Sequence, residues 1–146
     1  MIYLDSSYLV RLYLLQPGST EVEAWITGKN DWICCLHGRL EVISALKRQQ
    51  RAGHIDDRGL RGAIRQLSND QASTLLRWLP VSSELVELAC DRLAALPPEV
   101  FLRAADALHL ACAKDAGLKE IYSHDRHLLA AAPHFGLKGM DVIKSP

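Results

Sequence analysis

Short apolar runs alternate along this chain with longer segments in which apolar residues recur at helical spacing. The runs lack the period-two alternation of a half-exposed strand, so each is expected to be buried on both faces. Right-handed crossovers build such strands into a parallel sheet covered by helices on either side. The sequence therefore predicts an α/β fold, a three-layer α/β/α sandwich with a short, mainly parallel central sheet. The predicted strands are Met1–Leu4, Asp31–Cys35, Arg77–Val81, Glu120–Ser123 and, at an edge, Met140–Ile143.

The segments between these runs carry helix start and stop signals, such as Ser, Thr or Asp before a helix and Gly after it. A chain of 146 residues without repeats or low-complexity stretches is most simply one domain, spanning residues 1–146. The predicted helices are Ser6–Leu15, Ser19 or Thr20 to Thr27, Leu36–Gly53, Asp56 or Asp57 to Leu76, Ser82 or Ser83 to Leu96, Leu102–Ala116 and Arg126–Ala131.

Four carboxylates lie where an unpaired carboxylate would be costly. Asp5 and Asp125 each follow a predicted strand, Glu41 lies early in a helical segment, and Asp106 interrupts an almost wholly apolar stretch. A buried carboxylate needs hydrogen bonds, an ion pair or a metal. Ligand sites in parallel sheets lie beyond the carboxyl ends of the strands, where the strand order reverses. This placement predicts one acidic site that holds a divalent cation.

Each of these carboxylates also has an ordinary structural explanation. Asp5 and Asp125 could be helix N-caps, and Glu41 could be a first-turn glutamate. Asp106 could be an early-helix residue that favours the helix dipole. Its neighbours on the same helix face are apolar, however, and four independent coincidences at one rim are a weaker account than one shared site.

Four ordered motifs resemble those of the PIN-domain nucleases, and more closely those of the VapC-type toxin ribonucleases. The first is the strand, aspartate, hydroxyl residues and apolar helix of Met1–Tyr13. The second is Leu40–Leu46, with its helical glutamate, and the third is Arg103–Ala111, with its aspartate. The fourth is Ser123–Leu128. The motifs span essentially the whole chain in the family's order. One departure is the stretch before the glutamate, where the family often has Ser or Thr.

The resemblance implies a PIN-like fold and a metal-dependent endoribonuclease. The four carboxylates would hold one or two Mg²⁺ ions, for which Mn²⁺ could substitute, and the metal would activate water for attack on an RNA phosphodiester. Ser7 and Ser123 would orient a carboxylate or a metal-bound water. Transfer, ribosomal and messenger RNA are all open as substrates.

The resemblance also implies partners. The protein would be the toxin of a type II toxin–antitoxin pair, bound by a cognate VapB-type antitoxin, and would form a homodimer. Apolar residues of the first two predicted helices are expected to exceed what the core needs and to contribute to antitoxin binding. These residues are Val10, Leu14, Val22 and Trp25.

A basic stripe offers a possible substrate surface. Arg58, Arg61 and Arg65 recur at helical spacing and could contact RNA phosphates. The alternative is a solvated helix face, which the aspartates nearby favour. The formal net charge of zero argues against a protein that coats nucleic acid without specificity.

The histidines and cysteines show no zinc-binding spacing. Cys34, Cys35, Cys90 and Cys112 are expected to be small buried hydrophobes in a reducing cytosol. His109 is expected to play a hydrogen-bonded structural role, and no histidine is assigned to catalysis. A cationic leader and a bilayer-spanning apolar run are both missing from the sequence, which predicts a cytoplasmic protein without membrane contact.

Two other functions compete with the nuclease. A phosphoryl-transfer enzyme with a haloacid-dehalogenase-like fold would want Asp-x-Asp after the first strand, but the sequence there is Asp5-Ser6-Ser7. One with a receiver-like fold would want a lysine at the end of a late strand, for which Lys144 is the only candidate. A non-catalytic PIN-like module that binds partners would not need an intact set of carboxylates.

Overall fold

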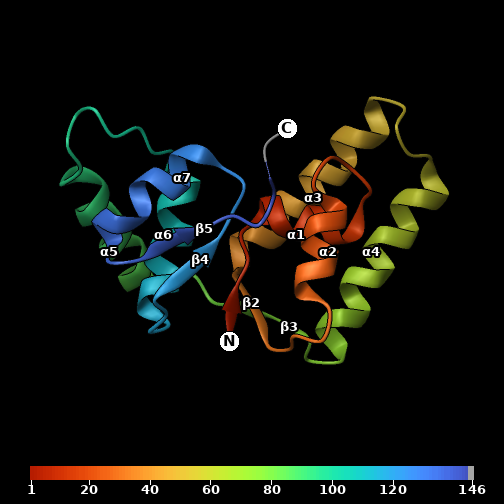
Figure 1. The fold of residues 1–146 in the computed structure, drawn as a ribbon, viewed down its shortest axis with the longest axis horizontal. Coiled ribbons are helices and arrows are strands. Elements are labelled where there is room, and N and C mark those ends of the chain that lie inside the picture. Colours follow the sequence, from red (N-terminus) through yellow and green to blue (C-terminus); the bar gives the residue numbers. More distant parts are fainter. Residues whose placement is uncertain (145–146) are drawn as a thin grey trace.

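All strands of the central sheet are parallel, and the direction in which successive strands are added reverses at the middle of the sheet. The structure, a computed structural model, describes residues 1–144. Three strands pair in the order β1-β2-β3, β4 pairs with β5, and one parallel bridge from Leu4 to Tyr122 joins the two sheets. The order across the molecule is thus β3-β2-β1-β4-β5 (Figure 1). The strands are β1 (Ile2–Tyr3), β2 (Trp32–Cys35), β3 (Leu76–Leu79), β4 (Glu120–Tyr122) and β5 (Lys138–Met140).

Helices cover both faces of this sheet, which confirms the predicted three-layer α/β/α sandwich. Helices α1 to α4 gather on one side, and α5 to α7 gather on the other (Figure 1). None of the helices in residues 1–144 is long and apolar enough to span a membrane. The helices are α1 (Ser6–Tyr13), α2 (Ser19–Ile26), α3 (Leu36–Arg51), α4 (Asp57–Ala72), α5 (Ser83–Ala94), α6 (Ala104–Asp115), α7 (Arg126–Ala131) and a 3₁₀ turn (Ala132–Phe135).

The alternation of side chains along β2 separates two hydrophobic cores. All four residues of the strand are buried. Trp32 and Cys34 pack into the core under α1 to α4, whereas Ile33 and Cys35 pack into the core under α5 to α7. Successive residues of a strand point to opposite faces, so this short apolar run serves both cores at once. This is why the run shows no polar alternation in the sequence.

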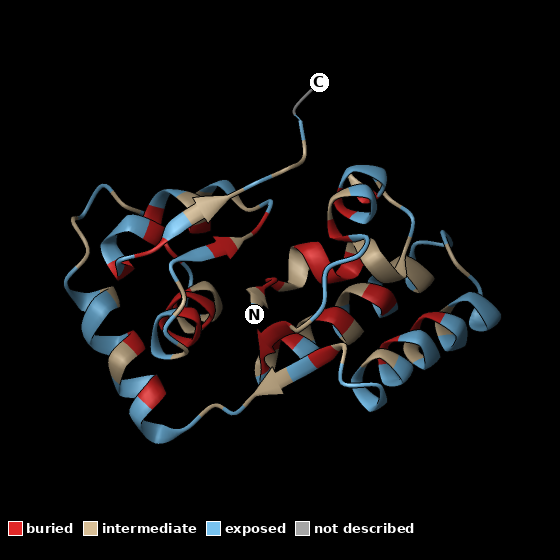
Figure 2. Cartoon of the chain, turned by 60° about the horizontal axis from the view of Figure 1, so that its bottom comes forward, coloured by how far each residue is buried: buried red, intermediate tan, exposed pale blue. Residues whose placement is uncertain are grey.

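Helix α6 lies deepest in the molecule and carries the third motif. Six of its residues are buried, against two each in α5 and α4, and its ribbon carries more red than theirs in Figure 2. It begins after Arg103 and ends before Gly117, whose φ of 78° is the left-handed conformation that glycine adopts without strain. Because the helix is held on most sides by packing, the side chains at its N-terminal end have fixed positions.

Several element boundaries and environments differ from the sequence predictions. The last strand is Lys138–Met140, two residues earlier than predicted, because the chain turns at Gly136 and pairs with β4 directly afterwards. The expectation for Cys90 was wrong, since it lies on an exposed face of α5, while the other cysteines are buried. Val10 and Val22 are also buried core residues, which leaves them unavailable to a partner and corrects that part of the predicted antitoxin surface.

Candidate functional site

All four predicted carboxylates line one cleft at the carboxyl ends of β1 and β4. The cleft has a volume of about 350 Å³ and lies at the point where the strand order reverses. Parallel α/β sheets place ligand sites at such a point because the connecting loops diverge there. The polar residues that line the cleft are Asp5, Ser6, Ser7, Arg11, Gln16, Glu41, Arg48, Gln49, Arg103, Asp106 and Asp125.

Asp5 is the most buried of the four carboxylates and is held by hydrogen bonds on both oxygens. It caps α1, where its Oδ1 accepts hydrogen bonds from Tyr8 N–H at 3.1 Å and from the Ser7 hydroxyl at 2.6 Å. Its Oδ2 accepts a hydrogen bond from the Ser123 hydroxyl. Burial raises the pKa of Asp5 above its ordinary value, while the charge of His109 and these hydrogen bonds oppose the shift. The N-cap explanation is therefore correct, but it accounts for only one of the two oxygens.

Asp125 is positioned by a second N-cap and by Ser123. Its Oδ1 accepts from the backbone N–H groups of His127 and Leu128 at the start of α7, at 2.8 and 3.0 Å. Its own N–H donates to the Ser123 hydroxyl oxygen at 2.9 Å. Since Ser123 also donates to Asp5, one hydroxyl links the first and fourth motifs.

Asp106 lies in the first turn of α6 and faces the other acids. Its side chain is 15% exposed, and Arg103 Nε lies 3.8 Å from its Oδ2. Arg103 also reaches Asp125, at 3.5 Å, so that one exposed guanidinium spans both carboxylates. Burial and then repulsion from the Asp125 carboxylate raise the pKa of Asp106 to about 6.

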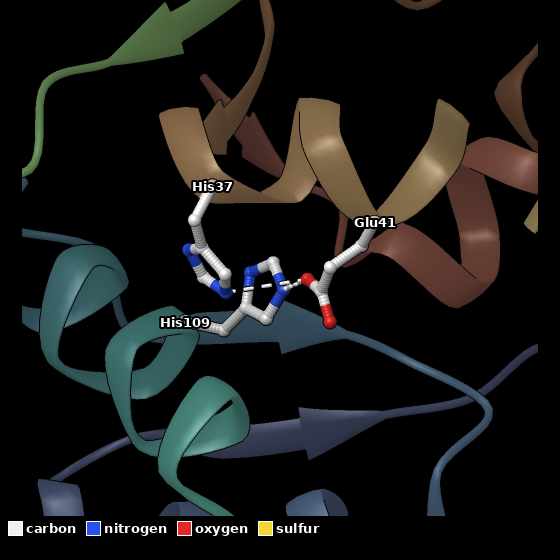
Figure 3. Close-up of side chains that lie close together, drawn as sticks. All are labelled: His37, Glu41 and His109. Atoms are coloured by element: carbon white, nitrogen blue, oxygen red, sulfur yellow. Dashed lines mark hydrogen bonds and ion pairs between the residues drawn. The ribbon is translucent and has the colours of Figure 1, made fainter. Parts of the chain in front are cut away.

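Glu41 lines the cleft from α3, but its carboxylate is engaged by two histidines (Figure 3). Its Oε1 lies 2.6 Å from Nε2 of His109 on α6 and 3.2 Å from Nε2 of His37, one helical turn earlier on α3. Burial would raise the pKa of Glu41, but the hydrogen bond from His109 and the neighbouring His37 hold it well below its ordinary value. Glu41 is thus ionised and restrained on one side of the cleft.

Gly38 allows α3 and α6 to approach closely enough for this contact. A Cβ atom at this position would lie 3.1 Å from Cε1 of His109 and would also collide with the Cys34 sulfur. The stretch before Glu41 departs from the family pattern at this point, and the structure gives the departure a packing role.

The donor set of the cleft fits a hard divalent cation. Asp5, Asp106 and Asp125 offer carboxylate oxygens, which Mg²⁺ and Mn²⁺ prefer, and Glu41 adds a fourth carboxylate at the rim. Burial and repulsion from Asp125 raise the pKa of Asp106, and a bound cation would favour its ionised form. Ser7 and Ser123 restrain Asp5 in the way that neighbours of a metal ligand do.

The positive charge that lines the cleft comes from residues outside the predicted arginine stripe. Arg11, Arg48 and Arg103 line the cleft, and Arg11 is fixed by its bonds to the carbonyl oxygens of Ser7 and Pro17. The predicted stripe of Arg58, Arg61 and Arg65 lies exposed on α4 and does not line the cleft. Arg48 belongs to the basic end of α3, so its proximity could have been found only with the helix packing in hand.

The histidine contacts were also missed as part of the site. The predicted hydrogen-bonded role of buried His109 is confirmed, because its Nδ1 lies 2.8 Å from the Tyr3 hydroxyl and its Nε2 bonds to Glu41. Neither His37 nor His109 was connected to Glu41 in advance. The spacing of His37 and Glu41, four residues apart on one helix, was the available signal.

Fold and cleft together define a three-layer α/β protein with an acidic site at the point where the strand order reverses. Residues 2–133 match the family described as PIN domain, and the chain belongs to that family. It is similar to Ribonuclease VapC47 of Mycobacterium tuberculosis (strain CDC 1551 / Oshkosh), with 28% identity over 142 residues that cover 93% of each chain. These matches support a VapC-type PIN nuclease.

Two solved structures share the fold. Mycobacterium tuberculosis VapC20, described as a sarcin-ricin loop cleaving toxin, has a TM-score of 0.71 and 21% identity over 90% of this chain and 95% of its own. FitAcB from Neisseria gonorrhoeae has a TM-score of 0.75 and 18% identity over 97% of this chain and 98% of its own. At these identities the likeness establishes the fold.

Proposed function

We propose that this protein is a Mg²⁺-dependent endoribonuclease that acts as the toxin of a type II toxin–antitoxin pair. The observation that carries the proposal is the convergence of all four carboxylates on one cleft that arginines also line. An oxygen-only donor set beside fixed cationic groups suits hydrolysis of a phosphodiester, because metal and phosphate must be held together. The names of VapC47 and VapC20 agree with this chemistry.

Each part of the cleft has a distinct task in this mechanism. Asp5, Asp106 and Asp125 would hold the cation, with Glu41 completing the set. When bound, Mg²⁺ would lower the pKa of a water and stabilise the negative charge that develops on the phosphate. Ser7 and Ser123 orient Asp5 and favour its charged form through their hydroxyl donors.

The arginines supply the contacts to the substrate backbone. Arg11 and Arg48 line the same cleft as the acids and would bind RNA phosphates as charge-assisted donors. Arg103 already pairs with Asp106 and Asp125 and would exchange those partners for the scissile phosphate once a cation neutralises the acids. Such an exchange would make RNA and metal bind cooperatively.

The competing functions have less support from the geometry. Lys144 is exposed and is absent from the residues that line the cleft, so the lysine that receiver-like phosphoryl transfer would need is not supplied there. A module used only to bind partners would have no need for Asp5 to be held on both oxygens.

The test is cleavage of total cellular RNA by the purified protein. Discrete products are expected with Mg²⁺ and should disappear with EDTA or in Asp106→Asn. Asp115→Asn is the matched control, because Asp115 is an exposed acid at the end of the same helix and does not line the cleft. Intact RNA in the presence of Mg²⁺, with the metal bound at the cleft, would reject the nuclease and favour a partner-binding or phosphoryl-transfer role.

An antitoxin of the VapB type is the proposed partner, and a homodimer is the proposed oligomeric state. Of the apolar residues first considered for the antitoxin surface, Leu14 and Trp25 are only half-buried and remain available. Co-expression of the antitoxin should relieve growth arrest caused by this protein. Unchanged antitoxin affinity in a variant altered at both residues would exclude this surface.

A further inference from the structure

His37, Glu41 and His109 form a cluster whose ligand atoms converge from two helices. Figure 3 shows His37 and Glu41 descending from α3 and His109 rising from α6 to meet them. One atom from each side chain can be chosen so that all three lie within 4.8 Å of one another. The two imidazole rings lie with their centroids 4.4 Å apart. The cluster therefore offers two nitrogens and one oxygen to a single point.

The donor types differ from those of the acidic cleft. Two imidazole nitrogens and a carboxylate oxygen suit Zn²⁺ and similar transition-metal ions, whereas Mg²⁺ prefers oxygen alone. Three protein ligands also leave a fourth position open, as in metal sites that exchange their ion or bind water. The cluster and the cleft are thus suited to different classes of cation.

Two of the three ligand separations are already close to those around a bound ion. Ligands about 2.0–2.1 Å from a tetrahedral zinc ion lie roughly 3.3 Å from each other. The 3.2 Å between His37 and Glu41 already matches this separation. The 2.6 Å between His109 and Glu41 must widen by roughly 0.7 Å, within the reach of a glutamate side-chain rotation.

Tyr3 prepares His109 to act as a ligand. Its hydroxyl oxygen accepts a hydrogen bond from Cys35 N–H at 3.0 Å and lies 2.8 Å from Nδ1 of His109. For Nε2 to bind an ion, the proton that it donates to Glu41 must leave to solvent, and a proton on Nδ1 that faces the Tyr3 oxygen then fixes the tautomer whose Nε2 lone pair is free. A ligating histidine whose other nitrogen is held in this way is the usual arrangement in metal sites.

The two ring nitrogens of His37 are buried without hydrogen-bond partners among the described residues. Both are shielded from solvent, and neither makes a hydrogen bond of good geometry within residues 1–144. The contact with Glu41 is an ion pair alone. Buried nitrogens without hydrogen bonds are costly, and coordination to a metal would satisfy one of them.

We propose that His37, Glu41 and His109 bind a transition-metal ion of the Zn²⁺ class and that the ion regulates the acidic cleft through Glu41. The regulatory part rests on the proposed nuclease function, because it assigns Glu41 to both sites. A zinc ion on the two histidines holds Glu41 away from Asp5, Asp106 and Asp125. Occupancy of this cluster therefore inhibits Mg²⁺-dependent cleavage without filling the cleft.

Metal binding is tested directly on the wild-type protein. Co²⁺, as a visible-absorbing substitute for Zn²⁺, should give the intense bands of a low-coordinate site with nitrogen ligands, and one equivalent of Zn²⁺ should abolish them. Competition with a chromophoric chelator at pH 8 gives the Zn²⁺ affinity. Only the weak absorption of six-coordinate Co²⁺, or no saturable Zn²⁺ binding, would overturn the proposal.

Three variants locate the ion. His37→Gln should weaken Zn²⁺ binding at least tenfold, whereas His54→Gln, which alters an exposed histidine bonded to Gln49, should not. Asp106→Asn should leave the Zn²⁺ affinity within about threefold of wild type. The opposite pattern, with loss in Asp106→Asn and none in His37→Gln, would move the ion to the acidic cleft and reject the site. Circular dichroism checks that each variant is folded.

The regulatory part has a separate readout. Zn²⁺ should reduce RNA cleavage in saturating Mg²⁺, and the inhibiting concentration should rise at least tenfold in His37→Gln, with each rate normalised to the same variant without Zn²⁺. Binding of Zn²⁺ without inhibition would keep the metal site and reject the regulation. If the protein cuts no RNA, the proposed function fails, and the Co²⁺ and Zn²⁺ measurements still decide the site.

Discussion

The Ser123 hydroxyl donates a hydrogen bond to Asp5 across 118 positions of the chain. The same oxygen accepts the N–H of Asp125 at 2.9 Å. A single side chain thus sets the distance between two of the proposed metal ligands. In this arrangement the serine acts through the carboxylates it positions.

Ser123→Ala should reduce both stability and metal affinity. Removing the hydroxyl leaves the Asp5 carboxylate and the Asp125 N–H each short of a partner in a buried place, at a cost of about 1–3 kcal/mol in the free energy of unfolding. Metal affinity should fall about 10–100-fold, as is common when a residue that orients a ligand is lost. Urea unfolding and Mg²⁺ titration measure the two effects. Ser44→Ala, an exposed serine on α3, is the control and should change neither.

The raised pKa of Asp106 predicts a loss of stability as pH rises. The unfolded carboxyl has a pKa of 3.8 and the folded one about 6, so the folded state binds the proton more tightly. This group's contribution to the free energy of unfolding therefore falls between about pH 4 and pH 6, by on the order of 2 kcal/mol. Asp106→Asn should lack this slope, and saturating Mg²⁺ should restore wild-type stability at pH 7.

Parallel pH series of wild type and Asp106→Asn isolate this group, because Glu41 has a lowered pKa and contributes with the opposite sign. If the free energy of unfolding depends on pH in the same way in both proteins, the pH dependence does not come from Asp106.

Two substitutions of Asp125 should separate its charge from its capping role. Asn is as good an N-cap as Asp, so Asp125→Asn should keep α7 intact while RNA cleavage in Mg²⁺ falls. Asp125→Ala should lose cleavage as well and should also lower the free energy of unfolding by about 1 kcal/mol. Thermal unfolding and single-turnover cleavage distinguish the cases. Full activity in Asp125→Asn would show that Asp125 only caps α7 and is not needed as a metal ligand.

The two basic surfaces predict different salt dependences of RNA binding. Arg48→Ala, on the cleft, should lower the slope of log affinity against log salt concentration by about one charge. Arg61→Ala, on the exposed face of α4, should leave the slope unchanged if the stripe is merely solvated. Binding is measured in Ca²⁺ to limit cleavage. If Arg61→Ala also lowers this salt dependence, the RNA-binding surface includes α4.

The elements and the acidic site were predictable because their signals are local. Asp5, Asp106 and Asp125 each follow a strand or begin a helix, so parallel topology alone sends them to one rim. The strand Trp32–Cys35 is buried on both faces, and its lack of polar alternation predicted a sheet that is covered on both sides. These features depend on residues next to each other in sequence.

What escaped prediction depends on how helices pack. The contact of Glu41 with His109 needs α3 and α6 to approach at Gly38, and no periodicity encodes that distance. Arg48 reaches the cleft only because α3 points along it. The exposure of Cys90 likewise follows from which face of α5 meets α6.

One bridge pair, Leu4 with Tyr122, is the junction between the three-stranded and the two-stranded parts of the sheet. Asp5 lies on one side of this junction and donates its N–H to the Tyr122 carbonyl oxygen, whereas Asp106 and Asp125 lie on the other side. Parting the two sides would scatter the carboxylates and would also open the core under α5 to α7, because Tyr3 and Ile33 pack there with Ile121. Hydrogen exchange at the Asp5 amide therefore reports the fraction of molecules whose cleft is assembled.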